Sequence, residues 1–174
     1  GYNLGNTMES NPYASWWKPE EKTVADWEKA WGQPQVTKET IQTLKAKGFN
    51  VLRLPVTWYP HIAKFSKTYT KDEDYAIDAA WMARVKEIVK MINDEGMYCI
   101  VNIQHDAGAN NGSGDPNSAW LHADNDYENV TKIYQAIWKQ IATELKDFDD
   151  KVIFESFNEI LNAKSSWTAP AAGD

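Results

Sequence analysis

The order of strand-like and helix-like segments predicts an α/β fold with a parallel sheet. Four short apolar runs, typical of buried strands, alternate with longer segments whose apolar residues recur every three or four positions. Strands that alternate with helices in this way indicate parallel βαβ units. Long polar stretches follow the first three strands, at residues 6–36, 57–77 and 104–126. Because α/β barrels carry their functional loops on that side, these stretches favour a barrel.

The boundaries of the elements come from local signals in the chain. We expect strands at residues 2–5, 49–56, 97–103 and 152–157. The first helix should begin after Thr37, whose hydroxyl can accept a hydrogen bond from the first turn, and end at Gly48. The second should begin at Asp78 and stop at Gly96, and the third should span about residues 127–145.

The length of the chain limits how much of a barrel it can form. The 174 residues fit one domain, whereas a complete (β/α)8 TIM barrel needs roughly 250 residues and at least about 200. We therefore expect residues 1–174 to be the N-terminal half of a catalytic domain, with four βα units, two unpaired edges and poor stability as a monomer. A doubly wound sheet would share the order, but Gly5-Asn6-Thr7-Met8 lacks the Gly-rich phosphate motif.

Composition argues against several classes of function. A net charge of −7 without a basic stripe makes nucleic acid an unsuitable partner. No apolar run approaches the ~20 residues of a membrane-spanning helix. Cys99 is the only cysteine and is expected to be a small buried hydrophobe. We expect no cofactor and no metal site, since short ligand spacing is absent among the three histidines, His61, His105 and His122.

The fourth strand runs into Asn158 and Glu159, and this is the most informative feature of the chain. Barrel enzymes keep their chemistry at the open ends of the strands. Hydrolysis of a glycosidic bond normally needs two carboxylates there, one as acid and one as nucleophile or base. Glu159 is the candidate for the first; a helix cap or a surface charge is the alternative for an isolated glutamate. Only a short tail follows Glu159, so the pattern predicts half of a glycosidase.

Polar residues in the second and third strands point to the same site. Arg53 interrupts an apolar strand, which is costly unless the charge is paired, and its planar fork suits a carboxylate. The alternative is a structural ion pair with Glu155 or with a helix residue. Alternation places Asn102 and Gln104 on one face, pointing into the barrel. His105 follows in the loop, where a purely structural histidine is the alternative.

Nine tryptophans are an unusual count for this length. An indole offers a flat apolar face with one polar edge, which suits stacking on the apolar face of a sugar ring. The candidates in long loops are Trp16, Trp17, Trp31, Trp58, Trp120 and Trp167. Packing beneath the loops is the alternative for each of them. Trp27, Trp81 and Trp138 lie in helix-like segments and are expected in the core.

Taken together, these stretches resemble glycoside hydrolase family 5, the family of cellulases and their relatives. The matching stretches occur in the same order along the whole chain. They are Gly5-Asn6-Thr7, Trp31-Gly32-Gln33-Pro34, Gly48-Phe49-Asn50-Val51-Leu52-Arg53-Leu54-Pro55-Val56-Thr57-Trp58, Val101-Asn102-Ile103-Gln104-His105-Asp106 and Phe154-Glu155-Ser156-Phe157-Asn158-Glu159.

The resemblance implies a (β/α)8 barrel and an endo-β-1,4-glucanase with a retaining mechanism. It implies that Glu159 is the acid/base, that Asn158 contacts the sugar beside the scissile bond and that Arg53 supports the nucleophile. Further substrate contacts are expected from Asn6, Trp58, Gln104, His105, Trp120 and Trp167. The family's nucleophile is a glutamate on strand seven. The resemblance therefore implies that this fragment is inactive alone and that its partner is the C-terminal half of the barrel, in the same or a second chain.

Two residues depart from the family pattern, and the substrate stays open. Gln104 stands where the family usually has histidine; it forms hydrogen bonds but cannot titrate near neutral pH, so we expect substrate binding to be kept, with His105 taking part of the role. Ile160 replaces a common proline, which should matter little. Mannan, xyloglucan or mixed-linkage glucan are alternative substrates, and a non-catalytic carbohydrate-binding fragment is a further alternative. A polymeric substrate implies secretion or display at the cell surface.

Overall fold

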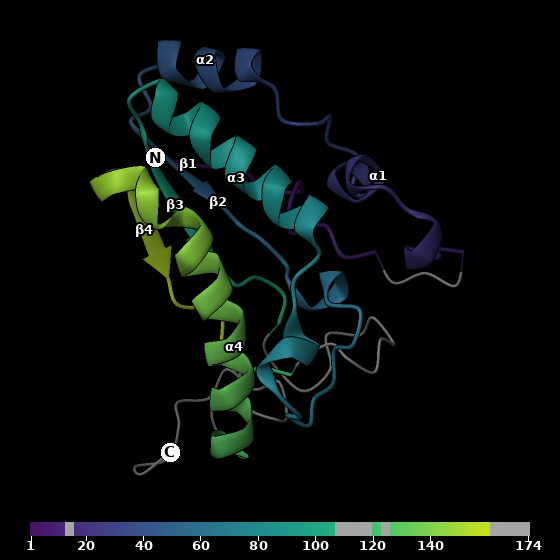
Figure 1. Ribbon diagram of the computed structural model, residues 1–174. Coiled ribbons are helices and arrows are strands. Elements are labelled where there is room, and N and C mark those ends of the chain that lie inside the picture. The colour runs from purple at the N-terminus through teal and green to yellow at the C-terminus, as the bar shows by residue number, and fades with distance from the viewer. Residues whose placement is uncertain (13–15, 107–119, 123–125, 161–174) are drawn as a thin grey trace.

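A single parallel sheet is the centre of the computed structural model, which describes residues 1–12, 16–106, 120–122 and 126–160 (Figure 1). Its four strands are β1 (Tyr2–Asn3), β2 (Val51–Leu54), β3 (Tyr98–Asn102) and β4 (Val152–Glu155), hydrogen-bonded in the order of the sequence. The register pairs Leu52 of β2 with Cys99 of β3, and Cys99 with Val152 of β4. The parallel sheet and the four strands agree with the sequence prediction, and the arrangement is that of half a (β/α)8 barrel.

The helices follow the predicted caps closely. The α-helices are α1 (Val24–Lys29), α2 (Lys38–Ala46), α3 (Ala79–Asp94) and α4 (Tyr127–Leu145), and the 3-10 turns are η1 (Pro19–Glu21), η2 (Tyr59–His61), η3 (Asp72–Tyr75) and η4 (Lys146–Lys151). The Thr37 hydroxyl accepts from the Thr40 amide at 3.3 Å, and the Asp78 carboxylate accepts from the Trp81 amide at 2.8 Å. Gly48 lies at φ +90°, a left-handed conformation that favours glycine after a helix.

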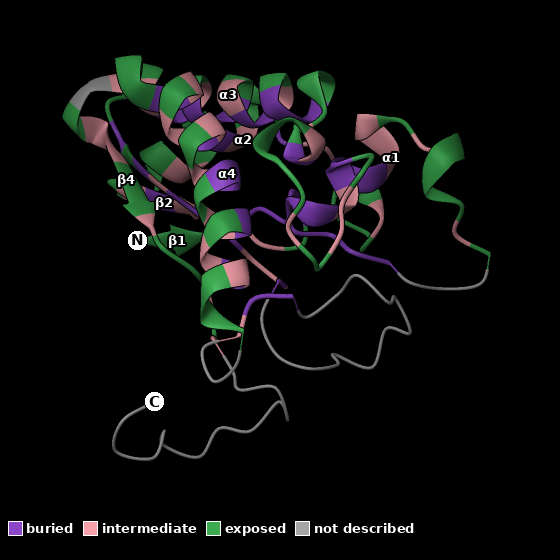
Figure 2. Ribbon diagram, turned by 60° about the horizontal axis from the view of Figure 1, so that its bottom comes forward, coloured by how far each residue is buried: buried purple, intermediate pink, exposed green. Residues whose placement is uncertain are grey.

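The core lies between the sheet and the helices that cover one of its faces (Figures 1 and 2). Leu52, Leu54 and Val101 point from the sheet toward this core, and the side chains of α3 that meet it are equally buried. Burial of one such aliphatic side chain stabilises the fold by about 1.5–3 kcal/mol. Cys99 and Trp81 are fully buried in the same layer, as expected.

The opposite face of the sheet carries the alternate residues of each strand. Arg53, Ile100 and Ile153 are neighbours across this face, because the register pairs Arg53 with Ile100 and Ile100 with Ile153. Ile153 is 45% exposed. This is the face that would line the interior of a closed barrel. Within the described residues, no helix combines the length and apolar character needed to cross a bilayer.

Candidate active site

An arginine organises the polar side chains at the carboxyl ends of the strands. Arg53, the third residue of β2, donates from Nε to Glu155 Oε2 at 2.7 Å and from Nη2 to Glu155 Oε1 at 2.5 Å. Glu155 is the last residue of β4, and the register with β3 sets both side chains on the inner face. The result is a bidentate ion pair across the sheet, the alternative that the sequence had left open for Arg53.

Three neutral oxygens complete the surroundings of the Arg53 guanidinium. Nη1 donates to Asn3 Oδ1 at 2.9 Å, and Nη2 donates to Asn158 Oδ1 at 3.0 Å and to Gln104 Oε1 at 3.3 Å. These partners come from β1, from the segment after β4 and from the segment after β3. The structure therefore brings together Arg53, Gln104 and Asn158, as the sequence predicted. Support of a nucleophile by Arg53 stays a prediction.

Asn102 links this group of side chains around Arg53, here called the Arg53 cluster, to the backbone of the segment that follows β2. Its Nδ2 donates to Gln104 Oε1 at 2.9 Å and to Glu155 Oε1 at 3.0 Å, while its Oδ1 accepts from the Val56 amide at 3.2 Å. Asn102 and Gln104 thus share the inner face, as alternation predicted. The hydrogen bonds from Arg53 and then from Asn102 hold the pKa of the Glu155 carboxyl below its usual value, so the group is ionised at neutral pH.

Glu159 lies at the tip of the turn that follows β4. The amide of Asn158 donates to the carbonyl of Ile103 at 2.9 Å, which extends the pairing with β3 beyond the end of the strand. Glu159 then adopts a left-handed backbone with φ 44°, uncommon for a residue other than glycine, and its side chain is exposed. The charge of Glu159 contributes to raising the pKa of Arg53, after the larger effects of Glu155 and then of Glu9. Glu159 therefore belongs electrostatically to the cluster.

The first loop brings a carboxylate that the sequence interpretation did not assign to the site. Glu9 is buried and accepts from the Asn6 amide at 2.6 Å and from the Thr7 amide at 3.0 Å. Burial raises the pKa of Glu9, opposed by these two amides and by the charge of Arg53. Asn6 has φ 60° and is exposed beside this turn. The Asn3 contact with Arg53 was also missed, although Asn3 lies on the strand next to β2.

His105 lies at the edge of the cluster rather than inside it. Its ring is half-buried and packs edge-on against Trp31, with the ring centroids 5.3 Å apart. Burial lowers the pKa of His105, so the imidazole is neutral at neutral pH. The next residue, Asp106, is buried and accepts a hydrogen bond from the Trp120 indole at 2.5 Å. These contacts anchor the start of the third loop.

The tryptophans divide into buried and exposed rings. Trp58 is 0% exposed and donates to the Asn102 carbonyl at 2.8 Å, while Trp120 is 2% exposed and bound to Asp106. Both rings are therefore buried, and packing beneath the loops, the alternative named for each tryptophan, describes Trp58 and Trp120 in this structure. Their contact with a sugar stays a prediction. Trp16 and Trp31 are 69% and 37% exposed. Trp167 lies outside the described residues.

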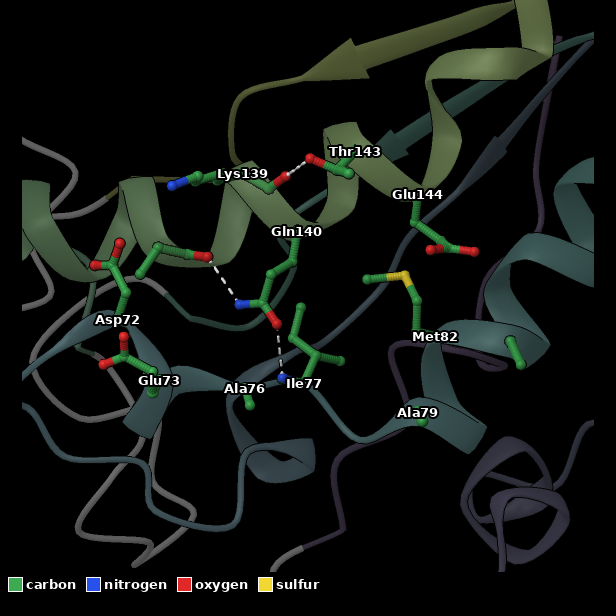
Figure 3. Close-up of a pocket in the computed structure, with 12 residues that line it drawn as sticks. Asp72, Glu73, Ala76, Ile77, Ala79, Met82, Lys139, Gln140, Thr143 and Glu144 are labelled. Atoms are coloured by element: carbon green, nitrogen blue, oxygen red, sulfur yellow. Dashed lines mark hydrogen bonds between the residues drawn. The ribbon is translucent and has the colours of Figure 1, made fainter.

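A separate groove of about 610 Å³ lies between η3, α3 and α4 (Figure 3). Gln140 of α4 spans it, accepting from the Ile77 amide at 3.0 Å and donating to the Ala136 carbonyl at 2.8 Å. None of the strand-end residues described above lines this groove. Because the convergent polar groups lie at the ends of the strands, we place the candidate active site there.

Residues 12–172 match the family described as Cellulase (glycosyl hydrolase family 5). The chain is 39% identical over 161 residues to endoglucanase B of Clostridium cellulovorans. This match covers 91% of this chain and 29% of that protein.

Two solved structures share the fold. A GH5-4 broad specificity endoglucanase from an uncultured bacterium is 38% identical, with a TM-score of 0.81 over 96% of this chain and 41% of that one. PbGH5A, a glycoside hydrolase family 5 enzyme from Prevotella bryantii solved with a xyloglucan tetradecasaccharide, is also 38% identical, with a TM-score of 0.78 over 97% of this chain and 43% of that one. The chain thus spans less than half the length of each of these three proteins.

Proposed function

The chain belongs to glycosyl hydrolase family 5, the cellulase family, and from this premise we propose that the whole protein hydrolyses internal β-1,4-glucosidic bonds in cellulose-type β-glucans. The observation that carries the proposal is the Asn158–Glu159 turn at the carboxyl end of β4, beside the Arg53 cluster. Residues 1–174 would then be the N-terminal half of the catalytic domain, with strands one to four of the barrel.

Glu159 is the acid/base in this proposal. It would protonate the leaving oxygen in the first step and activate water in the second, as in a retaining glycosidase. Its exposed side chain is open to a substrate, and Asn158, held by Arg53, would contact the sugar beside the scissile bond. The partner carboxylate of a retaining site lies about 5–5.5 Å from the acid/base.

The two nearby glutamates are poor candidates for the nucleophile. Both oxygens of Glu155 accept hydrogen bonds from Arg53, and both oxygens of Glu9 accept hydrogen bonds from backbone amides. A nucleophile needs an oxygen free to attack the sugar carbon, so these contacts support a nucleophile from the rest of the barrel, in the same or a second chain. Arg53 would stand beside it and stabilise its ionised form.

The polymer itself is proposed from the family and from exposed aromatic surface. Trp31, packed against His105 near the cluster, presents a partly exposed ring on which a glucan could stack. Asn6, Gln104 and His105 would add polar contacts. Because a polymer of this kind cannot enter a cell, we propose that the protein acts outside the cell or on its surface.

Xyloglucan is the second candidate substrate, because the similar enzyme from Prevotella bryantii was solved with a xyloglucan oligosaccharide. Turnover of a panel of soluble polysaccharides, including mannan and mixed-linkage glucan, by the full-length protein would rank the candidates. A clear preference for mannan would overturn the proposal of a glucanase.

The decisive test of the proposed function is Glu159→Gln in the full-length protein. Removal of a general acid/base lowers turnover by about 10²–10⁴-fold, so hydrolysis of carboxymethyl-cellulose should fall by that factor while binding persists. Glu20→Gln, a neutralised carboxylate on exposed η1, is the matched control and should keep normal turnover. Near-normal turnover by the Glu159 variant would contradict the assignment.

A further inference from the structure

Two aromatic residues of α4 hold the backbone that leads from β4 to Glu159. The Tyr134 hydroxyl donates to the Ser156 carbonyl at 3.2 Å, and the Trp138 indole donates to the same oxygen at 3.1 Å. Residues four apart on a helix lie on one face, so both donors approach Ser156 from the side of α4. The carbonyl at the end of the strand is thus bound by two side chains of the neighbouring helix.

The same short segment is also held by the neighbouring strand and by Arg53 on the inner face of the sheet. The Asn158 amide donates to Ile103, and the Asn158 carboxamide accepts from Arg53. Residues 156–158 are therefore held by α4 on the outer face, by β3 beside them and by Arg53 on the inner face. Glu159 follows immediately with its left-handed backbone, which non-glycine residues keep only where their surroundings enforce it.

The donors themselves are well placed to be rigid. The Trp138 ring packs edge-on against Phe154 of β4, with the ring centroids 5.6 Å apart, and Tyr134 packs against Trp138 at 6.2 Å. Burial raises the pKa of the Tyr134 phenol, so the hydroxyl keeps its proton and remains a donor across the working pH range of a glycosidase. The pair thus forms a fixed support beneath the turn.

We propose that Tyr134 and Trp138 are positioning residues for the acid/base Glu159, acting through the Ser156 carbonyl. This inference rests on the proposed function, because it assumes that Glu159 transfers a proton to the leaving oxygen. Proton transfer needs the carboxyl within about 2.6–3.2 Å of that oxygen. A displacement of about 1 Å can cost ~100-fold in rate, so slack in the support of the turn should slow the step that uses the acid.

The test compares two substrates that differ in their need for an acid. Tyr134→Phe and Trp138→Phe, singly and together in the full-length protein, remove the donors and keep aromatic rings in place. Tyr127→Phe is the control, since Tyr127 lies on the same helix and is 72% exposed. Soluble β-glucan has a sugar leaving group that must be protonated, whereas the dinitrophenolate of 2,4-dinitrophenyl β-cellobioside departs without a proton. The readout is kcat/KM, which covers the steps up to the first bond cleavage.

The double variant should lower kcat/KM on β-glucan by about tenfold and leave kcat/KM on the dinitrophenyl substrate within about twofold of the parent. Equal losses on both substrates would mean a merely structural role, and an unchanged value on β-glucan would mean no role; either result overturns the inference.

Glu159→Gln, measured in the same assay, separates this inference from the proposed function. If it loses β-glucan turnover and keeps dinitrophenyl turnover, the proposed function stands and only the positioning role is judged by the aromatic variants. If it keeps β-glucan turnover, both proposals fall.

Discussion

The Arg53–Glu155 pair combines a strong geometry with partial exposure. The two side chains are 24% and 30% exposed, so water screens their attraction more than it would in a closed interior. The bidentate arrangement and the Asn102 contact compensate by holding the carboxylate in one orientation. This charge pair fixes the inner face on which the candidate site is built.

Substitution of Glu155 should change how stability depends on pH. The pKa of Glu155 is lowered in the folded protein, so the stability from its ionised form is present above the ordinary value of about 4.3 and is lost as pH falls through the lower folded value. Glu155→Gln should therefore be less stable than the parent at pH 7, with a shallower loss of Tm between pH 5 and pH 3. Tm measured across that range, with Glu20→Gln as control, checks this; parallel curves for parent and Glu155→Gln would contradict it.

His61 gives a second pH dependence with a different origin. Its buried ring stacks on Trp81 at 3.5 Å and meets the edge of Trp27, and burial lowers the pKa of His61 to about 3. The unfolded chain binds a proton near pH 6.5, while the folded chain does not. The stability that depends on the neutral ring is thus complete above about pH 6.5 and declines as pH falls toward 3.

Replacement of His61 by phenylalanine keeps a ring between the two indoles and removes the titration. Between pH 6.5 and pH 5, above the pH range assigned to Glu155, the free energy of unfolding of His61→Phe should decline less than that of the parent. Urea unfolding at pH 5, 5.5 and 6.5 measures the difference. An equal slope in both proteins would show that His61 is protonated in the folded state.

At the scale of elements, a buried ion pair fastens α1 to α3. Glu28 of α1 is 0% exposed and accepts from Arg84 of α3 at 2.9 and 3.0 Å. Glu28 also accepts the Val36 amide at 2.6 Å and the Gln35 side chain at 3.1 Å. These contacts close the segment that carries Trp31, so they determine where that ring lies beside His105.

Loss of one partner of this ion pair should be far more damaging than loss of a surface pair on the same helix. Arg84→Met leaves the Glu28 carboxylate buried without its cation, which typically destabilises by about 3–5 kcal/mol. Lys86→Met is the matched control, because Lys86 pairs with Glu144 where both side chains are over 40% exposed, a pair worth about 0–1 kcal/mol. Chemical denaturation of the full-length protein gives both values. Equal losses for the two variants would contradict the argument, and Glu28→Leu combined with Arg84→Met should recover part of the loss.

The elements that sequence predicted well are those specified by local signals. Thr37, Asp78, Gly48 and Gly96 mark helix ends through contacts within a few residues, and the structure places α2, α3 and α4 accordingly. Trp27 was expected in a helix-like segment, but no bounds were predicted for helix α1 within the polar stretch 6–36. This helix is only six residues long, and the contact that anchors it joins residues 56 positions apart. A strand was predicted at residues 49–56, whereas β2 spans only Val51–Leu54. The apolar pattern indicates which residues are buried, but the bounds of a strand depend on hydrogen bonding to its neighbours.

The site was predicted where topology alone decides it. Parallel strands have their carboxyl ends at the same edge of the sheet. The sequence could therefore predict that Arg53, Gln104 and Asn158 lie close together. The choice between a substrate contact and the Glu155 ion pair for Arg53 depended on register, which the sequence does not reveal. The burial of Trp58 and Trp120 was equally hidden, because a loop sequence does not show which side of the loop faces the core.

At the scale of the whole molecule, the described sheet leaves apolar surface open. Ile153, Phe154 and Phe157 are 45%, 42% and 38% exposed around β4, the last strand of the sheet, and Tyr2 is 44% exposed on β1, the first. Exposed apolar residues at the edge of a sheet favour association with another strand. The remaining part of a barrel is the proposed cover for both edges.

Complementation tests this view of the whole molecule. The 174-residue chain alone should not hydrolyse carboxymethyl-cellulose. Among the three glutamates described at the strand ends, both oxygens of Glu155 and of Glu9 are engaged, and Glu159 alone is open to substrate. Addition of a polypeptide carrying the rest of the barrel should restore activity.

Ile153→Lys would place a charge on the inner face and should weaken this restoration of activity, whereas Tyr127→Lys at an exposed position of α4 should not. Activity of the chain alone would mean that Glu9 or Glu155 exchanges its present partners to act as the second carboxylate, or that copies of the chain assemble a site. Loss of that activity in Glu155→Gln but not in Glu9→Gln would identify which carboxylate takes the role.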